Sequence, residues 1–123
     1  MGKFSIRTTD KGCRFTLKAG NGEVIATSQV YASMDGCING IESVKSNVLE
    51  AAVEDQTVED YEKQSCPKFE VYVDKTGEFR FRLLAKNGQN IAASEGYAAK
   101  GSCMNGIESV RRNAVDAEVV QED

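Results

Sequence analysis

The stretch Asn-Gly-Ile-Glu-Ser-Val at residues 39–44 recurs letter for letter at residues 105–110. The offset of 66 residues extends well beyond this stretch, because residues 14–53 and 80–119 are identical at 21 of 40 paired positions. Agreement over so long a segment indicates an internal duplication. The fold is therefore expected to contain two copies of one structural unit.

The duplication defines the domain organisation of the 123-residue chain. We assign residues 3–55 to repeat 1, residues 56–67 to an acidic connector and residues 68–121 to repeat 2. A unit of about 50 residues has a marginal core when it folds alone. We therefore predict that residues 1–123 form a single domain in which the two repeats share one core.

Hydrophobic periodicity gives the same order of elements in both repeats. Three segments alternate apolar and polar residues, as strands do, and are followed by a helical apolar stripe and a fourth strand. The predicted strands are residues 3–9, 13–19, 23–30 and 50–55 in repeat 1 and 68–74, 79–86, 89–95 and 116–121 in repeat 2, and the predicted helices are 34–48 and 99–113. This order indicates the α+β class.

The turn at residues 20–22 sets the register of a hairpin. A two-residue loop would turn Val24 toward the core, whereas a three-residue loop with a bulge turns Ile25 toward it. Repeat 2 has Asn90 in place of Val24 but retains Ile25 as Ile91, which favours the three-residue loop. The predicted shared core is Phe15, Leu17, Ile25, Phe81, Leu83 and Ile91, with Asn90 exposed.

The helix of repeat 1 carries end signals and a packing signal. Ser33 is a predicted N-cap, and Asn47 is predicted to end the helix in the left-handed conformation. Gly40 returns as Gly106 although glycine costs a helix about 1 kcal/mol relative to alanine. We therefore expect neighbouring backbone to approach both glycines closely. The predicted apolar stripes are Cys37, Ile41, Val44 and Val48 in repeat 1 and Cys103, Ile107, Val110 and Ala114 in repeat 2.

Composition argues against several partners. The formal charge is −4, whereas nucleic-acid binding depends on neutralising phosphates, so we predict no nucleic-acid partner. No apolar run approaches the roughly 20 residues of a membrane span, and the N-terminus lacks the apolar core of a signal peptide. We therefore expect a cytoplasmic protein without a membrane partner. The local basic excess of repeat 2 is interpreted as solvated surface: Arg80, Arg82, Lys86, Arg111 and Arg112.

The residues also do not predict a metal, cofactor or catalytic site. The chain has no histidine and its four cysteines form no Cys-x-x-Cys pair. Cys37 and Cys103 occupy matching helix positions, and we interpret them as reduced, buried residues. Glu42 and Glu108 recur on the helix surface, where a carboxylate pair could bind a cation or act as acid and base, but solvated glutamates are the simpler interpretation. We therefore predict a non-enzymatic protein.

The repeated motifs resemble the YegP-like family, small bacterial proteins with one or two copies of a domain of unknown function. The resemblance rests on Tyr-Ala at 31–32 and 97–98, on Gly-Ile-x-Ser-Val-x-x-Asn ending at Asn47 and Asn113, and on the Asn-Gly turns. It implies two β3-α-β units that form one antiparallel sheet, exchange their last strands and place both helices on one face. It implies no established activity, cofactor or catalytic residue.

Two functions remain open. The first, which we favour, is a monomeric protein-interaction module that uses the uncovered sheet face, where Tyr72, Leu84 and Ala92 are predicted outward positions of low polarity. The second is small-ligand binding at the seam between the repeats, near Asn39 and Asn105. Helix-to-loop hydrogen bonding is the alternative role for these asparagines.

Overall fold

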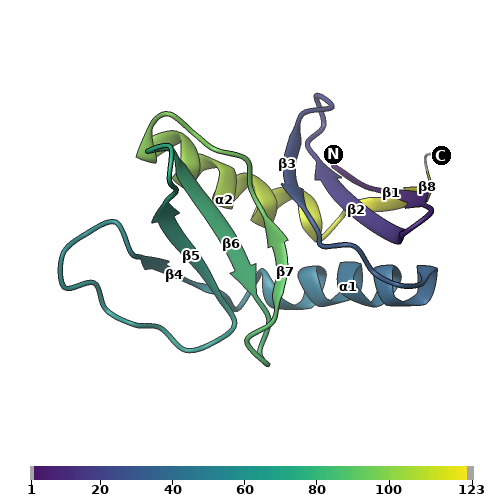
Figure 1. The fold of residues 1–123 in the computed structure, drawn as a ribbon, viewed down its shortest axis with the longest axis horizontal. Helices are drawn as coiled ribbons and strands as arrows, with labels where there is room; N and C mark the ends of the chain where they lie inside the picture. Colours follow the sequence, from purple (N-terminus) through teal and green to yellow (C-terminus); the bar gives the residue numbers. More distant parts are fainter. Residues whose placement is uncertain (1, 122–123) are drawn as a thin grey trace.

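The computed structural model describes residues 2–121, which form one eight-stranded sheet and two α-helices (Figure 1). All the predicted elements are present, with bounds that differ by a few residues. Repeat 1 contributes β1 (Lys3–Thr9), β2 (Gly12–Lys18), β3 (Val24–Thr27), α1 (Met34–Asn47) and β4 (Ala52–Asp55). Repeat 2 contributes β5 (Lys68–Val73), β6 (Phe79–Leu84), β7 (Asn90–Ala93), α2 (Lys100–Ala114) and β8 (Glu118–Gln121).

The last strand of each repeat belongs to the other repeat's half of the sheet. The strand order is β4-β5-β6-β7-β3-β2-β1-β8, so the exchange of last strands implied by the family resemblance is present. β4 runs parallel to β5 and β8 runs parallel to β1, whereas the other neighbouring strands are antiparallel. The sheet is therefore mixed, and the expected purely antiparallel sheet is wrong at both edges. Because side chains alternate with the same period in either orientation, the residue pattern does not reveal strand direction.

The two halves of the sheet meet at β3 and β7 in its centre (Figure 1). These strands share a single residue pair, Thr27 with Ala93, whereas β4 forms four pairs with β5 and β8 forms four with β1. The exchanged strands therefore join the repeats more extensively than the central strands do.

Cross-strand pairing defines the two faces of the sheet. Directly paired residues point to the same side, and one such set runs across the seam: Thr16, Thr27, Ala93 and Arg82. We call this side the open face. Phe15 and Phe81 each precede a member of the set by one position and so point to the other side, the helix face. The ring of Phe15 lies next to Gly40 of α1, and the ring of Phe81 lies next to Gly106 of α2.

The core lies between the helix face and the two helices. Each repeat contributes one edge-to-face aromatic pair, Phe4 with Phe15 at 5.6 Å between ring centroids and Phe69 with Phe81 at 5.9 Å. The six residues of the predicted core are all buried in one cluster, and Asn90 is exposed. The predicted core and the exposure of Asn90 are therefore confirmed.

The hairpin of repeat 1 has the predicted three-residue loop. The Gly22 N–H donates to the Ala19 carbonyl at 2.9 Å, and the Ala19 N–H donates to the Glu23 carbonyl at the same distance. Gly22 has a φ of +88°, a conformation that glycine adopts without steric strain. This is the arrangement of a tight turn closed by a glycine bulge.

A second bulge follows in each hairpin, and the residue pattern does not reveal it. In repeat 2, Leu84 pairs with Asn90, but the preceding Leu83 pairs with Ala92 rather than with Ile91. The extra residue places Ile91 and Ala92 together opposite one position of β6, and both are buried. The same shift occurs in repeat 1.

Polar side chains stabilise both ends of α1. Ser33 is the N-cap as predicted, because its Oγ accepts a hydrogen bond from the Gly36 N–H at 3.1 Å. The predicted left-handed end at Asn47 is wrong, since Asp60 is the only non-glycine residue with positive φ in the described part of the chain. Instead, Asn47 Nδ2 donates to the Ser43 carbonyl at 2.6 Å, which keeps this residue within the last helical turn.

Gly40 allows an aromatic side chain to lie against α1. A Cβ at this position would lie 2.8 Å from Tyr31 Cζ and 3.1 Å from Phe15 Cε2. Tyr31 stacks on Phe15 with centroids 6.2 Å apart. The close approach expected at this glycine is present, but aromatic rings make it rather than backbone. Gly106 has the same relation to Tyr97 and Phe81.

We expect Gly40→Leu and Gly106→Leu each to destabilise the protein by about 1–3 kcal/mol, because overpacking outweighs the gain in helix propensity. Gly101→Leu is the matched control, since apart from the adjacent residues and the local helix backbone no atom lies within 4 Å of a Cβ there. Chemical denaturation measures all three. Equal stability of the Gly40 and Gly101 variants would contradict the packing argument.

Candidate functional site

The predicted outward positions of repeat 2 do not form an apolar patch. Tyr72 and Leu84 lie on the open face, where they pair with Arg80 and Lys68, and both are half-buried. The prediction for Ala92 is wrong: this residue is 3% exposed and belongs to the core. The bulge in β7 turns it inward.

The four predicted helix positions, Asn39, Glu42, Asn105 and Glu108, are all exposed. Asn105 lines a hollow of about 290 Å³ at the seam, which also has lining residues from β3 of repeat 1, whereas Asn39 does not line it. Glu108 forms an ion pair with Arg111 at 3.2 Å. The structure therefore brings only Asn105 to a cavity between the repeats.

The open face of repeat 2 carries a buried ionic network instead of an apolar patch. Lys68 Nζ lies 2.8 Å from Glu54 Oε1 and 3.1 Å from Glu70 Oε2. Glu54 and Glu70 are 1% and 7% exposed. The connector completes the network, because Gln56 Nε2 and the Gln64 N–H donate to the Glu54 carboxylate at 2.6 and 2.7 Å. The exchanged strand β4 is thus bonded to repeat 2 through its side chains as well as its backbone.

The hydrogen bonds to Glu54 determine its ionisation. Burial alone raises the pKa of a carboxyl group, but the hydrogen bonds from Lys68, Gln56 and Gln64 outweigh burial and lower the pKa of Glu54 to about 2. Glu54 is therefore ionised throughout the neutral range.

Two further contacts attach β4 and the residue before it to α2. Lys100 at the start of α2 forms an ion pair with Asp55. Arg111 Nη2 donates to the Ala51 carbonyl at 2.6 Å, and its guanidinium lies over the Phe69 ring at 5.4 Å. These contacts fix the strand that repeat 1 contributes to repeat 2.

Both arginines on the open face of repeat 2 are paired with carboxylates. Arg80 Nε lies 2.6 Å from Asp74 Oδ2, and Arg82 Nε lies 2.6 Å from Glu70 Oε1. The Arg82 guanidinium also lies over the Tyr72 ring at 4.6 Å. Three basic side chains thus face three acidic ones on this surface: Lys68, Arg80 and Arg82 against Glu54, Glu70 and Asp74.

Repeat 1 has hydroxyl or apolar side chains where repeat 2 has these carboxylates. In repeat 1, Val120 pairs with Ser5, and Ser5 pairs with Thr16. The corresponding pairs in repeat 2 are Glu54 with Glu70 and Glu70 with Arg82. The equivalent of Asp74 is Thr9 and the equivalent of Arg80 is Arg14, but Arg7 replaces Tyr72. Within residues 2–121, neither Arg7 nor Arg14 forms an ion pair, and both are exposed.

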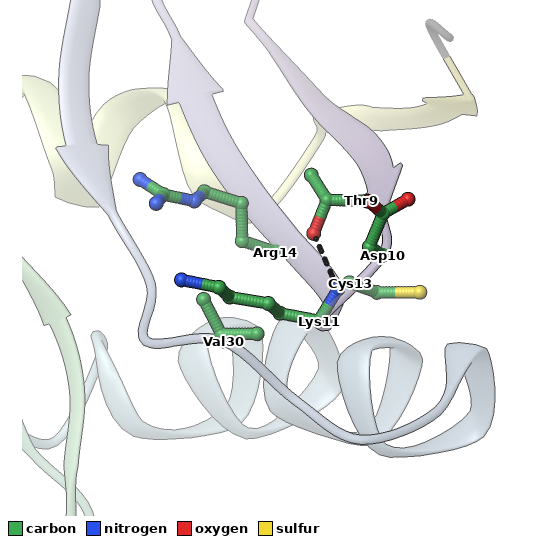
Figure 2. A pocket seen from close by; sticks show the side chains of 6 residues that line it. All are labelled: Thr9, Asp10, Lys11, Cys13, Arg14 and Val30. Carbon is green, nitrogen blue, oxygen red and sulfur yellow. Dashed lines mark hydrogen bonds between the residues drawn. The ribbon is translucent and has the colours of Figure 1, made fainter.

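The open face of repeat 1 has a hollow of about 400 Å³. We call the surface formed by its lining residues the arginine face: Ser5, Arg7, Thr9, Arg14, Thr16, Lys18 and Val24. None of these residues is acidic. A second hollow of about 420 Å³ shares Thr9 and Arg14 with it and is also lined by Asp10, Lys11, Cys13 and Val30. Figure 2 shows Arg14 and Lys11 extending to the same side of the turn, whereas the sulfur of Cys13 points away from them.

The arginine face was not predicted from the sequence. Repeat 2 was predicted to be locally basic, but its open-face arginines, Arg80 and Arg82, are neutralised by its own carboxylates. Comparing the two copies charge by charge would have shown the difference, because Glu70 and Asp74 correspond to Ser5 and Thr9.

We expect Cys37 and Cys103 to react slowly with a thiol reagent under native conditions. Both are 0% exposed, and burial raises the pKa of each thiol to about 11. Cys66 is half-buried and should react first. Native titration with mass spectrometric assignment tests this order. Rapid labelling of either helix cysteine would contradict it.

Two classes of site are not found within residues 2–121. No helix there is long and apolar enough to cross a membrane. No group of three or more cysteine, aspartate or glutamate side chains is placed to hold a metal ion in that range.

Comparison with known proteins places both repeats in one family. The family model described as a domain of unknown function, DUF1508, matches residues 9–55 and again residues 74–121. YegP of Escherichia coli is 38% identical over 113 residues, which cover 92% of this chain and 89% of that protein. Its solution structure superimposes with a TM-score of 0.81, at 34% identity, over 98% of this chain and 92% of that one.

Other relatives match over the length of one repeat. A UPF0339 protein of Treponema denticola is 59% identical over 54 residues, 44% of this chain and 93% of that protein. A UPF0339 protein from the ptx operon 5' region of Stutzerimonas stutzeri is 67% identical over 48 residues, 39% of this chain but only 43% of that protein. With two matched repeats and the YegP fold, the chain belongs to the DUF1508 (UPF0339) family, a family of unknown function.

Proposed function

We propose that this protein is a non-catalytic interaction module and that the arginine face of repeat 1 is its partner-binding surface. The observation that carries the proposal is the difference between the two open faces. Repeat 2 pairs its open-face arginines, Arg80 and Arg82, with its own carboxylates, whereas repeat 1 exposes Arg7 and Arg14 without an ionic partner among residues 2–121.

Strand geometry strengthens this interpretation. Arg7 and Arg14 are directly opposite one another on β1 and β2, and like charges in this relation destabilise an antiparallel pair. Repeat 2 avoids the repulsion, because Tyr72 stands opposite Arg80. An arrangement that is unfavourable in the free protein becomes favourable when a negatively charged group binds between the two side chains.

The chemistry of the other candidate residues supports a non-catalytic role. Cys37 and Cys103 are buried thiols with raised pKa values, the opposite of an activated nucleophile. Glu108 is engaged with Arg111. The residues that recur in both helices thus serve packing and surface ion pairing in this interpretation.

A pair of photo-crosslinking residues tests the proposal. Val24 lies at the arginine face, and its equivalent in repeat 2 is Asn90, at the same position of the other hairpin. A crosslinking amino acid at position 24 should capture a partner in cells that make the protein, and the same amino acid at position 90 should not. The captured band should disappear when Arg7 and Arg14 are both replaced by glutamate. Equal capture from both positions, or none from position 24, would overturn the proposal.

The seam hollow favours a second candidate function, the binding of a small polar ligand. Its lining combines both charges and several hydroxyl or amide groups from the two repeats: Glu23, Glu95, Arg112, Ser102, Ser109, Asn105 and Tyr97. A ligand that binds there should raise the melting temperature of the protein but not that of the Asn105→Leu variant. If every ligand that binds raises the melting temperatures of the wild-type protein and of the Asn105→Leu variant equally, the seam is not the binding site.

A further inference from the structure

We infer that the occupant of the arginine face is an acidic protein segment, whose carboxylates bind Arg14 and Arg7 as Asp74 binds Arg80 within repeat 2. This inference rests on the proposed function and specifies the chemistry of the partner. It follows from treating repeat 2 as an internal model of an occupied arginine face.

The internal model shows which group fits these arginines. Arg80 is the repeat-2 equivalent of Arg14, and it binds the Asp74 carboxylate through Nε at 2.6 Å. The same carboxylate accepts hydrogen bonds from the hydroxyl and the backbone N–H of Thr76, at 2.7 and 2.9 Å. In repeat 1, Thr9 replaces Asp74, so the position beside Arg14 is available for a carboxylate from another chain.

The second arginine distinguishes repeat 1 from its internal model. Where Tyr72 lies under the guanidinium of Arg82 in repeat 2, repeat 1 has Arg7, opposite Arg14. Arginine binds carboxylates through paired N–H donors. Two opposed guanidiniums therefore favour a segment with more than one acidic side chain over a single carboxylate.

The other side chains of the surface favour a protein over a nucleic acid. Single-stranded nucleic acids are bound by aromatic side chains on which the bases stack. The arginine face contains no aromatic residue, because Phe4 and Phe15 are both buried on the helix face. The net charge of −4 also opposes the approach of a long polyanion more than that of a short acidic segment.

An extended peptide in which glutamate alternates with serine is the probe, because alternate side chains of an extended chain point to one side. Its binding to the full-length protein is measured by fluorescence anisotropy. The comparison peptide has glutamine in place of glutamate, and a single-stranded oligonucleotide of equal charge is the third probe. We expect the glutamate peptide alone to bind, and its affinity to fall as salt is raised.

Charge-reversed variants locate the binding site. Arg7→Glu with Arg14→Glu should weaken peptide binding about ten-fold or more, equivalent to about 1.4 kcal/mol. Lys63→Glu with Lys75→Glu is the matched control, since it makes the same change in net charge at two exposed lysines outside the arginine face. The control should change affinity less than about two-fold, the effect expected of charges outside the interface.

A third variant separates binding from folding. Arg7→Tyr installs the residue that repeat 2 has at this position and removes the like-charge pair. It should weaken peptide binding while leaving the protein equally or more stable to denaturant. A loss of binding accompanied by a loss of stability would indicate unfolding and overturn the assignment of Arg7 to the binding surface.

Several results would overturn the inference. These are equal binding of the glutamate and glutamine peptides, tighter binding of the oligonucleotide, and glutamate-peptide binding unaffected by charge reversal at Arg7 and Arg14. Concentration-dependent self-association that this charge reversal abolishes would assign the face to a second copy of the chain instead. If the peptide fails but crosslinking at position 24 still captures a partner, the proposed function stands and only the acidic chemistry is refuted.

Discussion

Replacing Glu54 with glutamine should lower the free energy of unfolding by about 3 kcal/mol, because it leaves Lys68 buried with one carboxylate partner in place of two. Lys68 is 9% exposed and Glu54 is 1% exposed. The replacement also weakens the bonds from Gln56 and Gln64 that join the connector to β4. Equilibrium denaturation in urea measures the change.

Glu50→Gln is the matched control. Glu50 also forms an ion pair, with Lys86 at 3.6 Å, but the two side chains are 58% and 73% exposed. Exposed pairs contribute little to stability, about 0–1 kcal/mol. If the two glutamine variants are equally stable, the buried network does not hold the exchanged strand as we describe.

The acid sensitivity of the protein should change with Glu54. Its pKa is lowered from an ordinary 4.5 to about 2 in the folded state. A carboxyl with a lowered folded-state pKa contributes stability above its unfolded pKa and loses that contribution as pH falls toward the folded value. The wild type should therefore lose stability between about pH 4.5 and about pH 2, and the Glu54→Gln variant should lose less over the same range. Parallel pH profiles for the two proteins would contradict this.

A fragment of residues 66–123 should not fold as a monomer. Without repeat 1, β5 loses its neighbour β4 and β8 loses its neighbour β1, which leaves an unpaired edge and an unpaired strand. We expect the fragment either to remain unfolded or to dimerise, with β8 of each copy placed on β5 of the other. Such a dimer would reproduce the pairing of the intact sheet.

Light scattering and circular dichroism on the fragment and the full chain test this expectation. The full chain should behave as a monomer of 13.4 kDa. The Treponema denticola relative, which matches one repeat over 93% of its length, offers an independent comparison, since a one-repeat chain has the same unpaired edge. A folded monomeric fragment would show that each repeat closes its own core.

Much of the fold could be predicted because the chain contains its own comparison sequence. The exchange of Val24 for Asn90, with Ile25 retained as Ile91, was enough to choose the loop that the structure has. The second bulge could not be predicted in this way. Both copies have it at the same place, so comparing them produces no contrast, and Ala92 was assigned to the wrong face.

The ionic network could not be predicted from the sequence, for a different reason. Glu54 and Lys68 are 14 positions apart, and they meet only because β4 crosses to the other repeat and pairs in parallel with β5. No residue spacing encodes that contact. Likewise, the recurrence of Gly40 as Gly106 indicated close packing but not the packing partner, because Tyr31 lies outside the helix in sequence.

The exchange of strands also has a consequence for synthesis of the chain. β1 begins at Lys3, but its outer neighbour β8 begins only at Glu118 and ends at Gln121. While the chain is still emerging from the ribosome, the first strand has an open hydrogen-bonding edge until β8 has been synthesised. Domains usually fold during synthesis from the N-terminus onward, but repeat 1 cannot complete its half of the sheet in that order. The nascent chain therefore has to keep this edge from pairing with other chains until β8 is available to cover it.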